Sequence, residues 1–98
     1  MQRPECKFKT FTRHAIQKMF QRNVGKSEID NVISTGTIIK EYPNDLPYPS
    51  LLLLGFCDNR PLHIVLAFDK INNICIIVTV YEPDPNLWKE NYTRRIEK

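Results

Sequence analysis

The segment Ser50–Cys57, with the sequence SLLLLGFC, is apolar at both alternating positions of an extended chain. A strand with this pattern has both of its faces buried and lies in the interior of a sheet. The apolar run is too short to cross a bilayer as a helix, which takes about 20 residues. We therefore expect a central strand here, in a chain that does not associate with a membrane.

Turn residues separate this strand from similar segments on both sides. β-Branched residues favour a strand at Thr37–Tyr42, and two further apolar segments favour strands at Leu62–Phe68 and Ile74–Tyr81. Successive strands joined by short turns are usually antiparallel neighbours. The sequence therefore predicts a four-stranded antiparallel sheet in chain order.

Two helices are predicted before the sheet. Thr12 is a suitable N-cap for the first helix, which Gly25 is expected to end. Ser27 caps the second helix, and Gly36 closes it in a position that favours a left-handed residue. The predicted fold class is α+β, with two N-terminal helices on one face of a four-stranded antiparallel sheet and a short C-terminal helical turn near residues 86–92.

The length of the chain, 98 residues, predicts a single domain over residues 1–98. Its core is expected at about residues 11–88. Residues 1–8 and 93–98 are expected to be mobile ends, since chain termini are poorly ordered unless they are tied down.

The chain has three cysteines, Cys6, Cys57 and Cys75, an odd number without C-x-x-C spacing. This set predicts neither a disulfide framework nor a zinc site. The N-terminus also lacks the apolar stretch of a signal peptide. We therefore expect free thiols, a cytoplasmic location and no metal or other cofactor.

The first candidate site lies on the hairpin of the last two predicted strands. If residues 69–73 form its loop, His63 lies directly opposite Thr79, and Tyr81 is a diagonal neighbour on the same face. The other face of this hairpin is wholly apolar and should carry the helices. His63 could therefore transfer a proton, and Tyr81 could donate to an anionic group. The alternative is a structural histidine bonded to Thr79.

The second candidate site is a polar stripe on the first helix. His14, Lys18 and Arg22 follow one another at helical spacing, and Arg13 adds charge at the helix start. The chain as a whole carries a net charge of +3. Such a stripe could hold phosphate groups, although an ordinary solvated helix face has the same pattern.

The third candidate site is the proline-rich loop before the central strand. Asp45 and Ser50 are its polar residues, and they either position a substrate or only accompany the chain across the sheet edge. Arg60 and the tyrosines, among them Tyr42, could stack on the bases of single-stranded RNA. Plain packing is again the alternative.

Four motifs carry a resemblance to a known family: RHAIQKMFQRNV, VISTGTIIKEYPNDLPYPSLLLLGF, RPLHIVLAFD and IIVTVYEPDPNLW. Over about Thr12–Trp88 they resemble the domain-of-unknown-function 4258 family (DUF4258), small bacterial proteins that are similar to RelE-like toxins. The resemblance implies a cognate antitoxin with a zinc-finger-type domain. It also implies metal-independent cleavage of RNA on the sheet face opposite the helices, by attack of the ribose 2′-hydroxyl on the adjacent phosphate.

The family motif carries over onto His14, Arg22, Asp45, His63 and Tyr81 as the chemically active candidates. The leading hypothesis is an endoribonuclease toxin, in which His63 is the general acid or base, Tyr81 orients the scissile group, and Arg22 and His14 stabilise phosphate. The remaining candidates for substrate binding are Thr79, Arg13, Lys18, Asp45, Ser50 and Arg60. The rival hypotheses are a non-catalytic protein-interaction module and an RNA-binding protein without catalysis.

Overall fold

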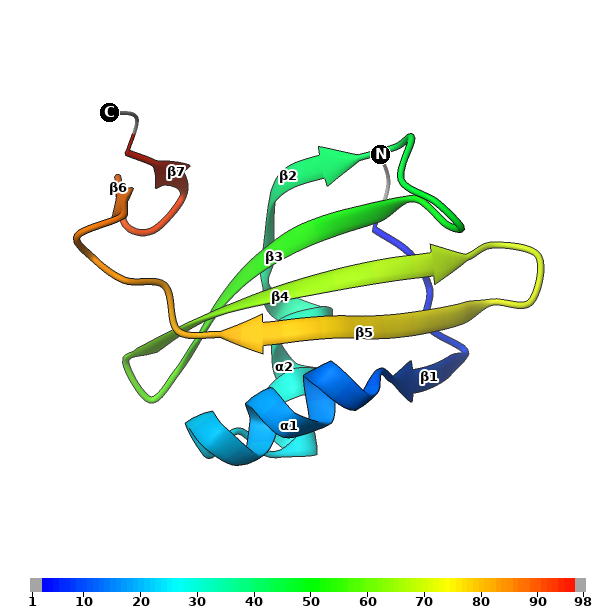
Figure 1. Ribbon diagram of the computed structural model, residues 1–98, viewed down its shortest axis with the longest axis horizontal. Helices are drawn as coiled ribbons and strands as arrows, with labels where there is room; N and C mark the ends of the chain where they lie inside the picture. Colours follow the sequence, from blue (N-terminus) through cyan, green and yellow to red (C-terminus); the bar gives the residue numbers. More distant parts are fainter. Residues whose placement is uncertain (1–2, 97–98) are drawn as a thin grey trace.

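The described residues form two helices and seven strands, which Figure 1 labels. The structure, a computed structural model, describes residues 3–96. Its elements are β1 (Phe8–Phe11), α1 (Arg13–Arg22), α2 (Lys26–Thr35), β2 (Thr37–Tyr42), β3 (Ser50–Cys57), β4 (Arg60–Asp69), β5 (Ile74–Tyr81), β6 (Trp88–Lys89) and β7 (Arg94–Arg95). Residues 1–2 and 97–98, which belong to the expected mobile ends, lie outside the described residues.

The main sheet has five strands in the order β1-β5-β4-β3-β2. Strands β2 to β5 form the predicted antiparallel meander, with β3 inside it. The prediction of four strands was wrong, because β1 pairs with β5 in parallel, as Figure 1 shows at the lower edge of the sheet. A parallel partner is joined through a long crossover rather than a tight turn, so no hairpin signal in the sequence marks β1.

The predicted C-terminal helical turn is replaced by a second, two-stranded sheet. Trp88 pairs with Arg95 across β6 and β7, which we call the C-terminal hairpin. The chain reverses at Glu90, Asn91 and Tyr92, whose φ angles are 53°, 58° and 68°. Three left-handed residues in succession cannot belong to a right-handed helical turn. The helical prediction at residues 86–92 was therefore wrong.

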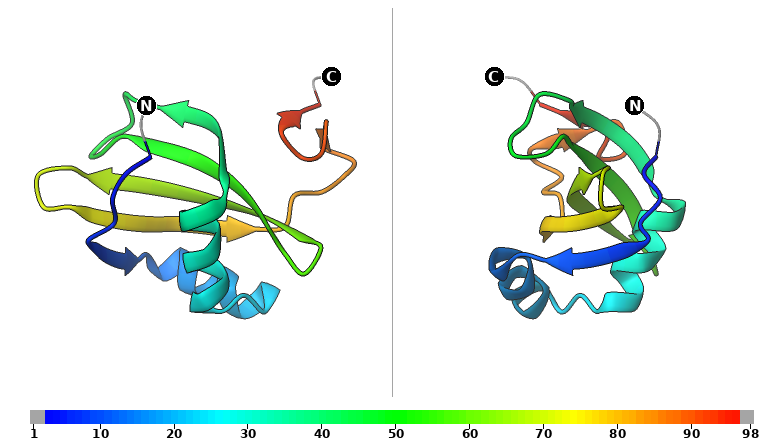
Figure 2. Two further views of the ribbon diagram at one scale, coloured as in Figure 1. Left: turned by 180° about the vertical axis from the view of Figure 1, so that it is seen from behind. Right: turned by 90° about the vertical axis from the view of Figure 1, so that its right-hand side faces the viewer.

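The core lies between the helical hairpin and one face of the main sheet (Figure 2). The helices and the loop between them contribute Ala15, Val24, Ile29, Val32 and Ile33, and the sheet contributes Leu51, Leu53, Leu62, Ile64, Leu66, Cys75, Ile77 and Val80. Each helix has ten residues, and no helix within residues 3–96 is long and apolar enough to span a membrane.

Gly36 does not have the left-handed conformation that the sequence predicts for a helix end. Its φ of −67° and ψ of 165° are extended. A Cβ atom at this position would lie 2.5 Å from the carbonyl oxygen of Val32 and 2.8 Å from that of Leu54. Glycine is thus required here by the close approach of α2 to β3, not by a left-handed angle.

The helix boundaries between α1 and α2 also differ from the prediction. Thr12 is the N-cap of α1 as expected, and its hydroxyl accepts a hydrogen bond from the Ala15 amide. Asn23, with a φ of 54°, takes the left-handed position that ends α1. Gly25 is instead the N-cap of α2, the role predicted for Ser27, and its amide donates to the Glu28 carboxylate at 3.0 Å.

The expectation of three free thiols was wrong for two of them. Cys6 and Cys75 form a disulfide between positions 69 residues apart, with their Cα atoms 5.2 Å apart. Their proximity follows from the parallel pairing of β1 with β5, which the sequence did not predict. Cys57 is the free cysteine of the described chain.

Candidate functional site

His63 and Tyr81 are direct partners across β4 and β5. The pairing of His63 with Tyr81, and of Val65 with Thr79, replaces the predicted pairing of His63 with Thr79. All three candidates still share one face, because the pair Val65–Thr79 is the next one on the same face after His63–Tyr81. The prediction of a common face is therefore confirmed, and the predicted register is wrong.

Two shifts of one residue each account for the difference in register. The hairpin closes with the pair Asp69–Ile74 rather than the predicted pair Phe68–Ile74, and a bulge interrupts the ladder between Val65 and Leu66. A shift of one residue moves a side chain to the opposite face. Two shifts in the same sense return it to the original face, so His63 remains on the face away from the helices.

His63 is fully buried on that face by the C-terminal hairpin. Its exposed fraction is 0%, and its ring lies edge-on to the Trp88 ring with centroids 4.4 Å apart. The imidazole Nδ1 lies 3.2 Å from the Tyr81 hydroxyl, and Nε2 lies 2.8 Å from the carbonyl oxygen of Tyr92. The sheet face is thus covered at His63, and the His63 side chain has no direct contact with solvent.

The hydrogen bonds of His63 determine its tautomer. A carbonyl oxygen only accepts, so Nε2 carries the proton that is donated to Tyr92. Burial lowers the pKa of His63 below its ordinary value of 6.5, and the bond to the Tyr92 carbonyl opposes this shift only partly. The ring is therefore neutral near pH 7, and its Nδ1 accepts the hydroxyl proton of Tyr81.

Tyr81 connects the buried histidine to the surface. Its side chain is half-buried. Burial raises the pKa of the Tyr81 hydroxyl, nearby Tyr42 raises it further, and Arg95 lowers it. These influences place Tyr81 within electrostatic reach of one residue from β2 and one from β7. We call Tyr81 and His63 the Tyr–His pair.

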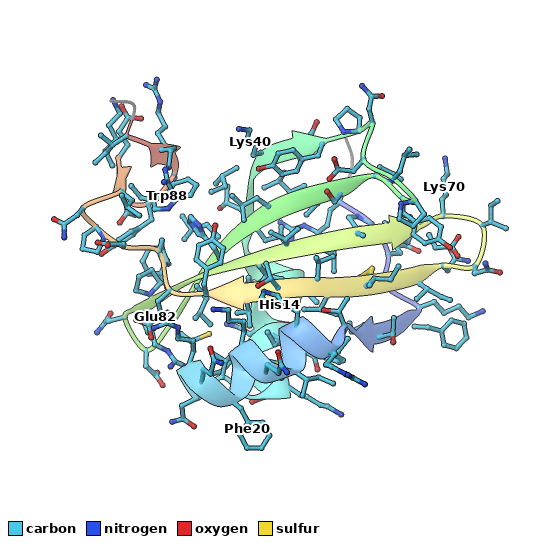
Figure 3. The ribbon with its side chains drawn as sticks, viewed as in Figure 1. His14, Phe20, Lys40, Lys70, Glu82 and Trp88 are labelled. Atoms are coloured by element: carbon cyan, nitrogen blue, oxygen red, sulfur yellow. A yellow bond between two sulfur atoms is a disulfide. The ribbon has the colours of Figure 1, made fainter. Side chains whose placement is uncertain are left out.

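A groove of about 400 Å³ lies between β2 and the C-terminal hairpin. We call it the basic groove, and it is lined by Ile39, Lys40, Tyr42, Leu52, Trp88, Thr93, Arg94 and Arg95. Figure 3 labels Lys40 and Trp88 on its two sides. The Lys40 ammonium lies 5.5 Å from the Tyr42 ring centroid, and the Arg95 guanidinium lies 5.8 Å from that of Trp88. The groove thus contains two pairs of a cation and an aromatic ring, one from β2 and one from the C-terminal hairpin.

Most of the basic groove could not be predicted from the sequence. Among its lining residues the sequence indicates Tyr42 as one that could stack on bases, but it does not indicate Lys40, Trp88, Arg94 or Arg95 as site residues. They converge only because the C-terminal hairpin folds back over the sheet. A basic pair six residues after a tryptophan is a weak signal, and it gains meaning only from this tertiary contact.

Asp45 and Ser50 form a separate polar pair at the other end of the same face. The Ser50 hydroxyl donates to the Asp45 carboxylate at 2.5 Å, beside a largely apolar cavity of about 370 Å³. Ser50 pairs with Ala67, four residues along β4 from His63, which corresponds to about 13 Å. Asp45 and Ser50 therefore do not belong to the same site as the Tyr–His pair.

The helical candidates remain apart from the Tyr–His pair. His14, Arg13 and Arg22 are exposed on α1 and Lys18 is half-buried there, and α1 follows β1 directly and packs against β5. The structure does not bring this stripe together with His63 in one site.

Arg60 has a structural role. Its guanidinium donates to the carbonyl oxygens of Arg22 at 2.9 Å and Asn23 at 3.1 Å, at the end of α1. It also forms ion pairs with Glu28 and, at 3.5 Å, with Glu82. These contacts join the helical hairpin to the sheet and commit the side chain that the sequence had assigned to base stacking.

The pH dependence of stability should report the burial of His63. Its pKa is lowered in the folded state and ordinary in the unfolded state, so the unfolded chain binds more protons between the lowered pKa and 6.5. The contribution of neutral His63 is complete above 6.5 and is lost as the pH falls toward the lowered pKa. We expect the free energy of unfolding, measured in urea, to fall across this window.

The control for this prediction is the second histidine of the chain, His14, which is exposed on α1. Replacing His63 with Gln should flatten the pH dependence in this window, whereas His14→Gln should leave it unchanged. Equal flattening by both substitutions would contradict the assignment to His63.

Comparison with known proteins adds a family to this geometry. No curated protein and no solved structure matches the chain. A family model described as "Domain of unknown function (DUF4258)" matches residues 11–82. This range includes the Tyr–His pair and ends before the C-terminal hairpin. The chain belongs to the DUF4258 family.

Proposed function

We propose that the protein binds single-stranded RNA in the basic groove and cleaves it without a metal, with the Tyr–His pair transferring the proton. The observation that carries the proposal is the hydrogen bond between the half-buried Tyr81 hydroxyl and neutral, buried His63. Residues of the basic groove adjoin this pair, because the Trp88 ring lies against His63, and Tyr42 and Arg95 act electrostatically on Tyr81. Cations neutralise phosphates, and aromatic rings stack on unpaired bases, so both parts of an RNA strand find suitable partners.

The proposed reaction begins with attack of a ribose 2′-hydroxyl on the adjacent phosphorus. Tyr81 accepts the 2′-hydroxyl proton as its own proton passes to Nδ1 of His63. The bond from phosphorus to the 5′-oxygen then breaks, and that oxygen takes a proton from water. The products are a 2′,3′-cyclic phosphate and a 5′-hydroxyl. His63 returns its proton through Tyr81 to the hydroxide that this water leaves.

The positive groove supports the charged transition state of this reaction. Lys40 and Arg95 lie on opposite sides of the groove, so a phosphate between them would gain charge stabilisation as its negative charge increases. His63 keeps its orientation throughout, because its Nε2 stays bonded to the Tyr92 carbonyl. His63 is in this scheme a proton acceptor that acts through Tyr81 rather than a group that touches RNA.

In the cell, this activity would be that of a bacterial toxin. The proposed partner is an antitoxin with a zinc-finger-type domain, and the proposed location is the cytoplasm, where the RNA is found. Disulfides are uncommon in that compartment. The proposal therefore requires that the groove keep its shape when Cys6 and Cys75 are thiols.

The test of binding uses a fluorescent single-stranded RNA oligonucleotide and anisotropy at several salt concentrations. Lys40→Gln and Arg95→Gln should each weaken binding for all sequences and make the slope of log K against log [salt] shallower by about 0.7, the value for one contact to single-stranded nucleic acid. Lys70→Gln is the matched control, because Lys70 is exposed in the β4–β5 loop at the far end of the sheet (Figure 3).

The same assay decides the chemistry and the compartment. Cleavage should persist in EDTA, yield 2′,3′-cyclic phosphate ends, and stop at a site where the 2′-hydroxyl is replaced by hydrogen. Binding should be the same with and without a reductant. Binding without any cleaved product would refute the catalytic part of the proposal, and an equal effect of Lys70→Gln would refute the groove as the binding site.

A further inference from the structure

Helix α1 has more apolar surface than its packing against the sheet uses. Ala15 is fully buried and Met19 is half-buried against the core. Ile16 and Phe20 lie one turn apart on the neighbouring side of the helix, and they are 49% and 87% exposed. Figure 3 shows Phe20 directed away from the body of the molecule. An aromatic ring exposed to this extent beside a second apolar side chain is a feature of interaction surfaces.

A cavity of about 500 Å³ continues this apolar surface toward the start of α2. Its lining includes Phe11, Met19 and Val24, together with Ile16 and Phe20. The cavity is therefore a groove that runs beside the exposed side chains of α1. An apolar groove beside a helix can take the apolar side chains of a second helix, which insert at positions three and four residues apart.

The charged side chain that lines this groove is positive, and the nearby carboxylate of Glu28 is paired with Arg60. Helix α1 contains Arg13, Lys18 and Arg22 and no acidic residue. Lys26 lines the groove, with its ammonium 5.8 Å from the Phe11 ring centroid. Arg13 lies one turn before Ile16 on the same side of the helix. No acidic side chain lines the groove, so acidic residues on a partner would find complementary charges there.

We propose that this groove binds an amphipathic helix of a partner protein whose apolar stripe is flanked by Asp or Glu. We call the groove the α1 docking surface and define it by Phe11, Ile16, Met19, Phe20, Val24 and Lys26. A second copy of the same surface would bring the basic residues of two α1 helices together without acidic partners, so charge favours a different protein. The surface lies on the helical layer, and RNA binding in the basic groove does not depend on it.

The test uses two labelled helical peptides and the whole chain. Both peptides carry leucines at helical spacing, flanked by Glu in one and by Lys in the other. In fluorescence anisotropy the acidic peptide should bind, and added salt should weaken its binding. Phe20→Ser should weaken it about tenfold or more, as expected for an aromatic anchor, and Lys26→Glu should weaken it about fivefold.

The control variant is Ile71→Ser, which removes an apolar side chain that is 92% exposed in the β4–β5 loop. It should leave peptide binding unchanged. Phe20 is itself so exposed that its replacement should not alter the circular dichroism spectrum. Equal binding of the basic peptide, or no effect of Phe20→Ser, would overturn the proposal. So would self-association in sedimentation that Phe20→Ser abolishes, because the occupant would then be a second copy.

Discussion

Replacing Tyr81 with Phe should lower the rate of RNA cleavage about a hundredfold or more, the usual contribution of a positioned proton-transfer group. The substitution keeps the ring in the sheet and removes the hydroxyl that joins RNA to His63. RNA affinity should change by no more than about twofold, because the charges of the basic groove are untouched. Single-turnover cleavage of a labelled oligonucleotide and anisotropy with the same RNA separate the two effects.

Tyr42→Phe is the matched control for this substitution. Tyr42 lines the basic groove near Tyr81, but the hydroxyl that bonds to His63 is that of Tyr81. The Tyr42→Phe protein should retain nearly the full rate of RNA cleavage. Tyr81→Phe also leaves Nδ1 of His63 without its donor, which should lower the free energy of unfolding by about 1–3 kcal/mol, so both proteins are compared well below their melting temperatures. Equal cleavage by the two variants would show that the Tyr–His pair has no catalytic role.

Replacing Gly36 with Ala should lower the free energy of unfolding by about 3 kcal/mol, the upper part of the range for overpacking. The added methyl group would meet two backbone carbonyl oxygens, those of Val32 and Leu54, and neither can move without shifting α2 or β3. Urea denaturation measures the change.

The other two glycines provide a graded comparison. At Gly55 the three atoms nearest to an added Cβ belong to the side chain of Val32, with Cγ2 at 2.6 Å, rather than to the backbone, so Gly55→Ala should have a smaller effect than Gly36→Ala. At Gly25 nothing lies within 4 Å, and Gly25→Ala should be nearly neutral. The reverse order of the three effects would contradict the close approach of α2 to β3 at Gly36.

The antiparallel part of the fold could be predicted because each strand carries its own signal. The bounds of β2, β3 and β5 agree with the apolar patterns at Thr37–Tyr42, Ser50–Cys57 and Ile74–Tyr81. Strand β1 has only four residues, mostly exposed, and its partner β5 begins more than 60 residues later. Its position depends on that long-range pairing and on the Cys6–Cys75 bond, which no local pattern encodes.

The candidate site was predictable in its residues more than in its surroundings. Alternation along the strands was sufficient to place His63, Thr79 and Tyr81 on one face, although a bulge altered their partners. Burial of His63 could not be predicted, since it depends on where a segment beyond the last long strand folds. The same segment supplies Trp88, Arg94 and Arg95 to the basic groove, which explains why the sequence did not reveal it.

The C-terminal hairpin has a practical consequence for work on the family domain. The family match ends at residue 82, whereas the acceptor for Nε2 of His63 is the carbonyl of Tyr92 and the ring against His63 is that of Trp88. A fragment cut at the family boundary would leave the imidazole hydrated and free to turn. The titration of His63 in this fragment, and any activity of the fragment, would reflect an environment of His63 that differs from its environment in the whole chain.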